Sequence, residues 1–261
     1  MRIIDAPVLD PNARLVDVLP ELLRSKCRCG VVASEGHVKG YLSLMNIVRR
    51  IVMEWKHGVE PHAAIEMLQV RNIHPHTVPV VHKSVEPEHL LVDMLMHDSD
   101  IALVEDNNSY IVNTVLDVAY ELRRMLYGLS VSSTVASQAW WAVHPHVSVR
   151  DALIHLAMLP TWRLAVVAPD NSVVGVFSAT DFFKVLLEGG RPYDMQLQDF
   201  LPESTPIVAD ADQSLVDILY IMRRYNIQMM PVIEGLAGFK GIVLAHDIAR
   251  LAAIQTLGGR G

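Results

Sequence analysis

The chain has 261 residues, of which 51% are hydrophobic, 20% charged and 6% aromatic, and its formal net charge is −7. This length fits one large or two modest domains of about 150 residues and allows a substantial core. No stretch approaches the roughly 18 apolar residues of a transmembrane helix, Asp5 and Pro7 interrupt any signal peptide, and the negative charge argues against a broad nucleic-acid-binding surface.

Four segments of the chain share one order of predicted elements: a helix, a strand with a small second residue, a polar turn, a second strand and a second helix. Each first helix carries an Asp among apolar residues, at Asp17, Asp93, Asp151 and Asp217. Each second strand ends just before the position where a helix N-cap is expected, at Asn46, Asp117, Asp181 and Asp247. The two markers are separated by 29, 24, 30 and 30 residues, which is too regular for coincidence.

The predicted fold class is therefore α/β (α+β), built from four β-α-β-β-α repeats. We place the repeats at residues 1–57, 70–128, 135–190 and 195–257. A unit of this size has a thin core, so we expect neighbouring repeats to pair. The Ser- and Gly-rich segment 127–134 is the best boundary between the two pairs.

The motifs that end these repeats resemble those of CBS (cystathionine beta-synthase) domains. They are Val-Val-Gly-Val-Phe-Ser-Ala-Thr-Asp at 173–181 and Gly-Ile-Val-Leu-Ala-His-Asp at 241–247, supported by 197–202 and 230–233. The resemblance is strongest in the third and fourth repeats and weakest in the second. It implies CBS repeats paired into two Bateman modules, similar in layout to the gamma subunit of AMP-activated protein kinase. It also implies a regulatory module that binds adenosine-containing ligands between paired repeats.

The motif around Asp181 has the chemistry of a nucleotide site in its own right. A carboxylate accepts two hydrogen bonds and suits the two hydroxyls of a ribose, whereas Ser178, Thr180 and a helix N-terminus suit a phosphate. Gly175 allows close approach of the strand to a ligand. A helix cap alone would account for the carboxylate but not for its neighbours.

Arg163 directly precedes the first strand of this repeat, from which a guanidinium can bind a phosphate in bidentate fashion. A surface arginine beside Trp162 is the alternative. The family resemblance implies that the adenine is read by the backbone of the strand that opens the partner repeat, here Thr205, Pro206 and Ile207. The site built on Asp181 is our first choice.

The other three sites depart from this pattern, and two of them are doubtful. The first repeat has Arg28 and Ser43 but carries Asn46 in place of Asp. The fourth repeat has His246 and Asp247 but lacks the hydroxyl and the basic residue.

In the second repeat Asp100 stands in the basic position and would repel a phosphate. We therefore expect that site to be empty.

Several other features are set aside as structural. Cys27 and Cys29 lie too close together to staple a fold and are too few to bind zinc, so we expect them to be buried in a reducing, cytoplasmic setting. The histidine pairs at 74–76 and 144–146 occupy different places in their repeats, so we expect no metal site. Trp140-Trp141 is interpreted as linker packing.

Three arginine pairs remain open: they could be solvated helix faces or could project into a central channel. These are Arg49-Arg50, Arg123-Arg124 and Arg223-Arg224.

No catalytic motif is present, and the repeats fill the chain, so we expect no enzyme. The hypothesis is an adenine-nucleotide sensor that binds AMP, ADP, ATP or S-adenosylmethionine and regulates a partner protein. A ligand-free scaffold for protein–protein interaction is the alternative, and a nucleic-acid-associated regulator is disfavoured by the charge. A homodimer is left open.

Overall fold

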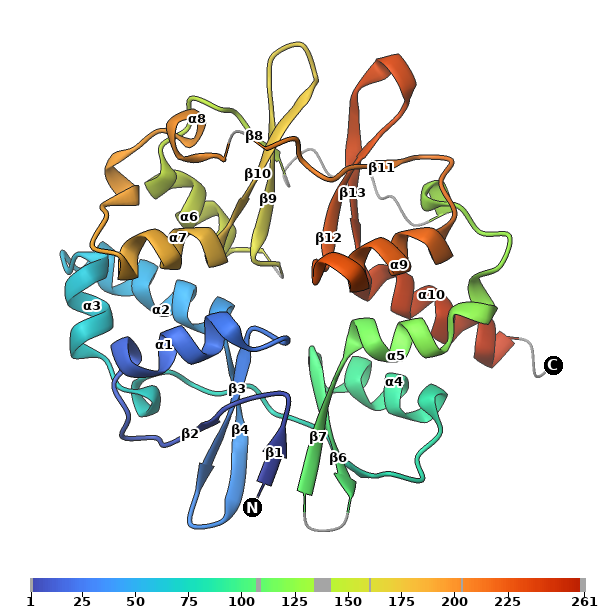
Figure 1. Cartoon of the computed structure of the whole chain (residues 1–261), viewed down its shortest axis with the longest axis horizontal. Helices are drawn as coiled ribbons and strands as arrows, with labels where there is room; N and C mark the ends of the chain where they lie inside the picture. Colours follow the sequence, from blue (N-terminus) through green and yellow to red (C-terminus); the bar gives the residue numbers. More distant parts are fainter. Residues whose placement is uncertain (1, 107–108, 134–141, 160, 203, 259–261) are drawn as a thin grey trace.

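The computed structural model describes residues 2–106, 109–133, 142–159, 161–202 and 204–258. Four β-α-β-β-α repeats are arranged around a common centre, with their β-hairpins pointing outward (Figure 1). The predicted fold class is confirmed. Within the described ranges, no helix is both long and apolar enough to cross a membrane.

The first two repeats form one module. The first consists of β2 (Val8–Leu9), α1 (Leu15–Arg24), β3 (Cys29–Ser34), β4 (His37–Ser43) and α2 (Leu44–Lys56). The second consists of β5 (Val80–His82), α4 (Pro87–Met96), β6 (Ile101–Asp106), β7 (Ser109–Thr114) and α5 (Val115–Glu121). Helix α3 (Pro61–Met67) and a 3-10 turn at Val70–Asn72 connect them.

The third and fourth repeats form the second module. The third consists of β8 (Ala142–Val143), α6 (Val149–Ala157), β9 (Arg163–Val167), β10 (Val173–Ser178) and α7 (Ala179–Leu187). The fourth consists of β11 (Ala209–Asp210), α9 (Leu215–Tyr225), β12 (Met229–Ile233), β13 (Phe239–Leu244) and α10 (Ala245–Gly258). The short helix α8 (Leu197–Phe200) precedes the fourth repeat.

Each repeat has its own sheet, in which the opening strand runs parallel to the first hairpin strand and the hairpin is antiparallel. Strand β1 (Arg2–Ile4), which the sequence did not predict, pairs in parallel with β7. The beginning of the chain therefore adds a fourth strand to the sheet of the second repeat, order β1-β7-β6-β5. This contact ties the two repeats of the first module together.

The second helices of three repeats begin with a hydroxyl cap rather than with the expected Asp or Asn. Ser43, Thr114 and Ser178 are the N-caps of α2, α5 and α7, and each accepts a hydrogen bond from the backbone three residues later. The predicted cap positions are therefore wrong by three residues. The acidic or amide side chain stands at the third helical position, where it can return a bond to the cap.

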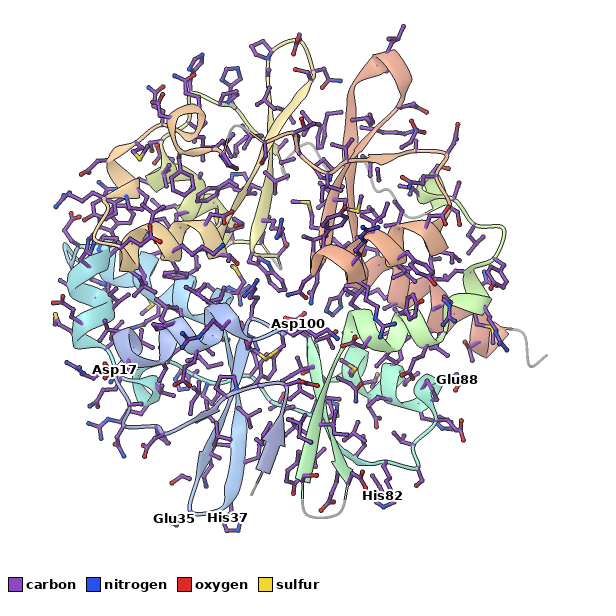
Figure 2. The ribbon with its side chains drawn as sticks, viewed as in Figure 1. Asp17, Glu35, His37, His82, Glu88 and Asp100 are labelled. Carbon is purple, nitrogen blue, oxygen red and sulfur yellow. A yellow bond between two sulfur atoms is a disulfide. The ribbon has the colours of Figure 1, made fainter. Side chains whose placement is uncertain are left out.

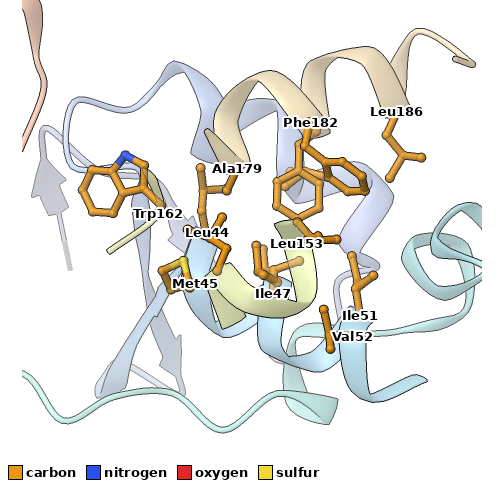
Figure 3. Close-up of a cluster of buried hydrophobic side chains, with 14 of the residues drawn as sticks. Leu44, Met45, Ile47, Ile51, Val52, Leu153, Trp162, Ala179, Phe182 and Leu186 are labelled. Carbon is orange, nitrogen blue, oxygen red and sulfur yellow. The ribbon is translucent and has the colours of Figure 1, made fainter. Parts of the chain in front are cut away.

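The hydrophobic core runs across the boundary between modules. One cluster joins helices of the first and third repeats, and a second cluster joins those of the second and fourth. Figure 3 shows the first cluster, in which Ile47, Leu153 and Phe182 are completely buried. Because burying one such side chain contributes about 1.5–3 kcal/mol, the two modules pack as one body. A third cluster joins the sheets of the first and second repeats.

Candidate functional site

The beginning of α7 holds Asp181 beside an open cavity. Ser178 Oγ donates to Asp181 Oδ2 and accepts from the Asp181 backbone N–H at 3.1 Å. The Asp181 side chain is 45% exposed, and its Oδ1 lies 3.7 Å from Lys184 Nζ. One carboxylate oxygen therefore orients the side chain, while the other lies near the Lys184 ammonium group and remains partly exposed. Thr180 is buried and does not line the cavity.

Arg163 begins β9 and pairs in register with Ser178, which places its guanidinium next to Asp181. Its Nε is buried and has no hydrogen-bond partner. Burial lowers the pKa of Arg163, Asp181 offsets part of this effect, and Arg28 adds to it. A buried, charged donor without a partner is costly, so it marks a place where an anion would be stabilised.

The segment between the third and fourth repeats forms the opposite wall. Thr205, Pro206 and Ile207 line the same cavity as Arg163 and Asp181, and its volume is about 350 Å³. This lies within the range of small-molecule pockets, about 300–1,000 Å³. The structure thus brings together five of the seven residues predicted for this site. Ser178 and Thr180 stand behind the wall.

Two other features of the wall were missed or interpreted differently from sequence. Ile227 and Met229 of the fourth repeat also line the cavity, and no sequence motif marked them. Gly175 lines it as well, and a Cβ at this position would lie 2.6 Å from Leu201 Cδ1. The absence of a side chain at Gly175 therefore leaves space for the Leu201 side chain as well as for the cavity.

Arg28 belongs to the first repeat, but it interacts electrostatically with Asp181 and Arg163 of the third repeat. Burial lowers its pKa, and the nearby Asp181 carboxylate raises it in part. The residue has a left-handed backbone with φ of 52°. It lies between Cys27 and Cys29, which are joined in a disulfide. The expectation of two reduced cysteines is therefore wrong. Because the disulfide joins residues only two positions apart, it constrains this one loop and does not connect distant parts of the fold.

In the first repeat, the strand that corresponds to β10 pairs with the segment that follows the repeat. Tyr41 and His76 exchange two backbone hydrogen bonds of 2.9 Å, and their rings stack with centroids 5.5 Å apart. No such pairing is present beside β10 among the described residues, and Tyr41 and His76 themselves line a second, central cavity. Asn46 Oδ1 accepts from the Ser43 N–H and Oγ, and its Nδ2 donates to the His74 carbonyl. Asn46 is thus engaged as part of the helix cap.

In the second repeat, the motif carboxylate Asp117 is paired with a lysine from the first repeat. Lys26 Nζ lies 2.6 Å from Asp117 Oδ1. Burial would raise the pKa of Asp117, but hydrogen bonds from Lys26 and Thr114 outweigh it and lower the pKa. The expectation that this site is empty stays a prediction, and Lys26 gives it a second physical reason.

In the fourth repeat, Asp247 opens α10 without a hydroxyl cap partner. Burial raises its pKa, and Arg250, 4.0 Å away, opposes this only in part. His246 Nε2 lies 2.7 Å from Asp100 Oδ1 of the second repeat. Asp100 lies at the centre of the molecule, where the modules meet (Figure 2).

These central residues line a smaller cavity, of about 200 Å³, which all four repeats share. Its lining includes Ser43, Asp100, Trp162, His246 and Asp247. Two positions that the sequence assigned to separate doubtful sites, Ser43 and Asp247, therefore face one space.

The possible metal ligands and the arginine pairs noted in the sequence are not among the described residues that line the Asp181 cavity. Within the described ranges, no group of three or more His, Cys, Asp or Glu side chains could hold a metal ion. Trp140 and Trp141 lie outside the described residues. Arg49 lines the central cavity and donates to two carbonyls of the third repeat, whereas Arg123 and Arg223 stack on Tyr120.

Residues 197–254 match the family model of the CBS domain. A curated relative from Acidianus ambivalens, an uncharacterized 17.7 kDa protein in the bps2 3′ region, is 25% identical over 118 residues, which cover 45% of this chain and 70% of the relative.

Two solved structures cover most of the chain. Protein MJ1225 from Methanocaldococcus jannaschii, proposed as an archaeal homolog of g-AMPK, has a TM-score of 0.79 and 21% identity, covering 95% of this chain and 96% of that one. An uncharacterized conserved protein from Pyrococcus horikoshii has a TM-score of 0.58 and 20% identity, covering 88% and 93%. At these identities the likeness is one of fold.

Proposed function

We propose that this chain, in which residues 197–254 form a CBS domain within a fold of four such repeats, is a regulatory module that binds an adenine nucleotide in the Asp181 cavity. The observation that carries the proposal is the buried Arg163 Nε, which has no partner and lies beside a cavity that Asp181 also lines. A phosphate would supply the missing acceptor and counter-charge.

The parts of a nucleotide correspond to the parts of the wall. Asp181 Oδ1 is available to accept from ribose hydroxyls. Arg163 and the N-terminal N–H groups of α7 suit the phosphate. Pro206 and Ile207 offer an apolar surface with adjacent backbone groups for the base.

The local charge favours phosphorylated ligands over S-adenosylmethionine. Arg28, Arg163 and Lys184 act on or surround Asp181, so these side chains sum to 3 − 1 = +2. A sulfonium would add a further positive charge, whereas AMP, ADP or ATP would neutralise the cluster. We therefore place the nucleotides before the sulfonium ligand.

A regulatory role follows from where the cavity lies. Its wall contains residues of the third and fourth repeats, and Arg28 of the first repeat interacts electrostatically with two of them, Arg163 and Asp181. A ligand that draws Arg28 and Arg163 together would favour one packing of the modules, which a regulated partner protein could read. The alternative is a scaffold with an unused cavity.

Isothermal titration with AMP, ATP and S-adenosylmethionine tests the proposal. We expect AMP or ATP to bind and Asp181→Ala to weaken binding by about tenfold or more, because each hydrogen bond to a charged group is worth roughly 1.5–3 kcal/mol.

Asp117→Ala is the matched control, since Asp117 occupies the same motif position but is paired with Lys26. Equal losses in both variants, or no binding below about millimolar concentration, would refute the site.

A further inference from the structure

A cluster of tyrosines and arginines lies on the surface where the second and fourth repeats meet. We call Tyr120, Arg123, Tyr220, Arg223 and Arg224 the tyrosine–arginine patch. The rings of Tyr120 and Tyr220 meet edge to face with centroids 5.3 Å apart. The guanidinium carbons of Arg123 and Arg223 lie 4.4 and 4.3 Å from the Tyr120 ring centroid. The cluster thus spans α5, the 3-10 turn after it, and α9 (Figure 1).

The arginines of the patch are not neutralised by the rest of the described chain. Within those residues neither they nor the adjacent Arg124 form an ion pair with a carboxylate, whereas Arg14, Arg50 and Arg191 each do. The chain as a whole carries a net charge of −7. The patch is therefore a local concentration of positive charge on an acidic protein.

Packing of the fold does not account for the patch. The helices α5 and α9 already bury Val118, Ile218 and Leu219 in the core, while the residue Tyr220 remains 58% exposed. On the other side of the molecule α1 and α7 take the corresponding places (Figure 1). There Pro20 and Lys184 occupy the positions of Tyr220 and Tyr120, counted from the shared Asp of the first helix and from the cap of the second. Two helices in corresponding places thus lie side by side without an aromatic pair between them.

We propose that the tyrosine–arginine patch binds an acidic segment of a partner protein. Guanidinium groups pair with carboxylates in bidentate fashion, and tyrosine and arginine are, with tryptophan, enriched among the residues that dominate binding energy at protein interfaces. Arginines stacked on Tyr120 are held in place before binding, which reduces the entropy lost on association. Nucleic acid fits less well, because four arginines on a chain of net charge −7 neutralise few phosphates.

Because the patch spans both modules, binding of such a partner would depend on how the two modules are packed against each other. Tyr120 and Arg123 belong to the first module, and Tyr220 and Arg223 belong to the second. A segment bound across both would have higher affinity for one arrangement of α5 and α9 than for another. Binding at the patch is thus expected to depend on module packing, independently of which ligand the Asp181 cavity accepts.

Fluorescence anisotropy with a short labelled peptide of repeated Glu-Glu-Tyr tests the proposal at low salt. We expect saturable binding that Arg223→Glu/Arg224→Glu weakens by about tenfold or more, since like charges across an interface are strongly unfavourable. The matched control is Lys39→Glu/Lys56→Glu, which places the same charge change on the β4 hairpin strand and in the last turn of α2, away from α5 and α9 (Figure 1). We expect it to change affinity by no more than about twofold.

A Lys-Lys-Tyr peptide and a single-stranded DNA of similar length complete the experiment. No binding of the acidic peptide, equal losses in both double variants, or tighter binding of the DNA would overturn the proposal. Thermal unfolding of each variant verifies its folding. Titration of AMP into the same variants reports on the Asp181 cavity separately, so failure of the nucleotide site is distinguishable from failure of the patch.

Discussion

Replacing Arg163 by methionine should stabilise the ligand-free protein. The guanidinium Nε is buried without a hydrogen-bond partner, and Arg28 adds like-charge repulsion. An unsatisfied buried donor costs about 1–3 kcal/mol, which a methionine of similar length does not incur. Asp181 loses a nearby cation, but its side chain is 45% exposed and keeps Lys184 at 3.7 Å, so this loss is small. We expect the free energy of unfolding to rise by about 1–3 kcal/mol.

The same substitution should remove most of the response to nucleotide. Losing two charge-assisted hydrogen bonds costs roughly 3 kcal/mol, which is about 100-fold in affinity. For the natural chain at a nucleotide concentration of 100 times Kd, ligand binding stabilises the fold by about 2.7 kcal/mol. At that concentration the Arg163→Met protein would be only half-saturated and gain about 0.4 kcal/mol.

Thermal unfolding with and without AMP measures both effects in one experiment. For a chain of this size each kcal/mol corresponds to about 2–4 °C in Tm. The variant should therefore start at least about 2 °C higher and shift far less on addition of AMP. Arg24→Met, on the exposed end of α1, serves as the control. A lower starting Tm, or an undiminished AMP shift, would refute the assignment of Arg163 as an anion-binding group.

Two further substitutions test the neighbouring sites. Gly40 has a φ of 143°, and a Cβ there would overlap the His76 carbonyl oxygen. Gly40→Ala should therefore lower the free energy of unfolding, measured by urea denaturation, by about 3 kcal/mol. The control is Gly36→Ala, whose Cβ would meet no other atom. Burial raises the pKa of Asp247, so its protonated form favours the fold below the ordinary pKa of about 3.9, and this contribution is lost as pH rises through the folded pKa. Asp247→Asn should therefore raise Tm at neutral pH and lose this advantage in acid; an equal gain at every pH would contradict the reasoning.

The local chemistry of the principal site was readable from sequence because it lies within one repeat and its connection to the next. Arg163 begins β9, and its partner in the paired strand, Ser178, caps the helix that carries Asp181, so the hairpin itself brings the two side chains near each other. Thr205, Pro206 and Ile207 were placed through the family resemblance, and the structure puts them on the same cavity. The cap was misplaced by three residues because Asp and Ser are both favoured at helix beginnings, and periodicity does not decide between them.

Contacts between distant repeats could not be read in this way. Nothing in the spacing of Lys26 indicated that it would pair with Asp117, which lies 91 residues away. The disulfide between Cys27 and Cys29 depends on the turn at Arg28. Arg28 has a left-handed backbone, but a left-handed residue is predicted from sequence mainly where a glycine stands, and here there is none. A signal did exist for the contact between β4 and the segment that follows the first repeat. Gly40 within a strand indicates close approach of another backbone, and that backbone is His76.

The loop that carries this disulfide connects the four repeats at one point. Lys26 pairs with Asp117 of the second repeat, and its carbonyl oxygen accepts from Asn226 of the fourth at 2.9 Å. Arg28, two residues later, acts on Asp181 of the third. Because Lys26 and Arg28 are only two positions apart and the disulfide restricts the turn at Arg28, we expect movement of Arg28 toward an anion to displace Lys26 as well. A change in charge at the Asp181 cavity would therefore reach the first module through one short, constrained segment, without requiring any rearrangement of the core that α2 shares with α6 and α7.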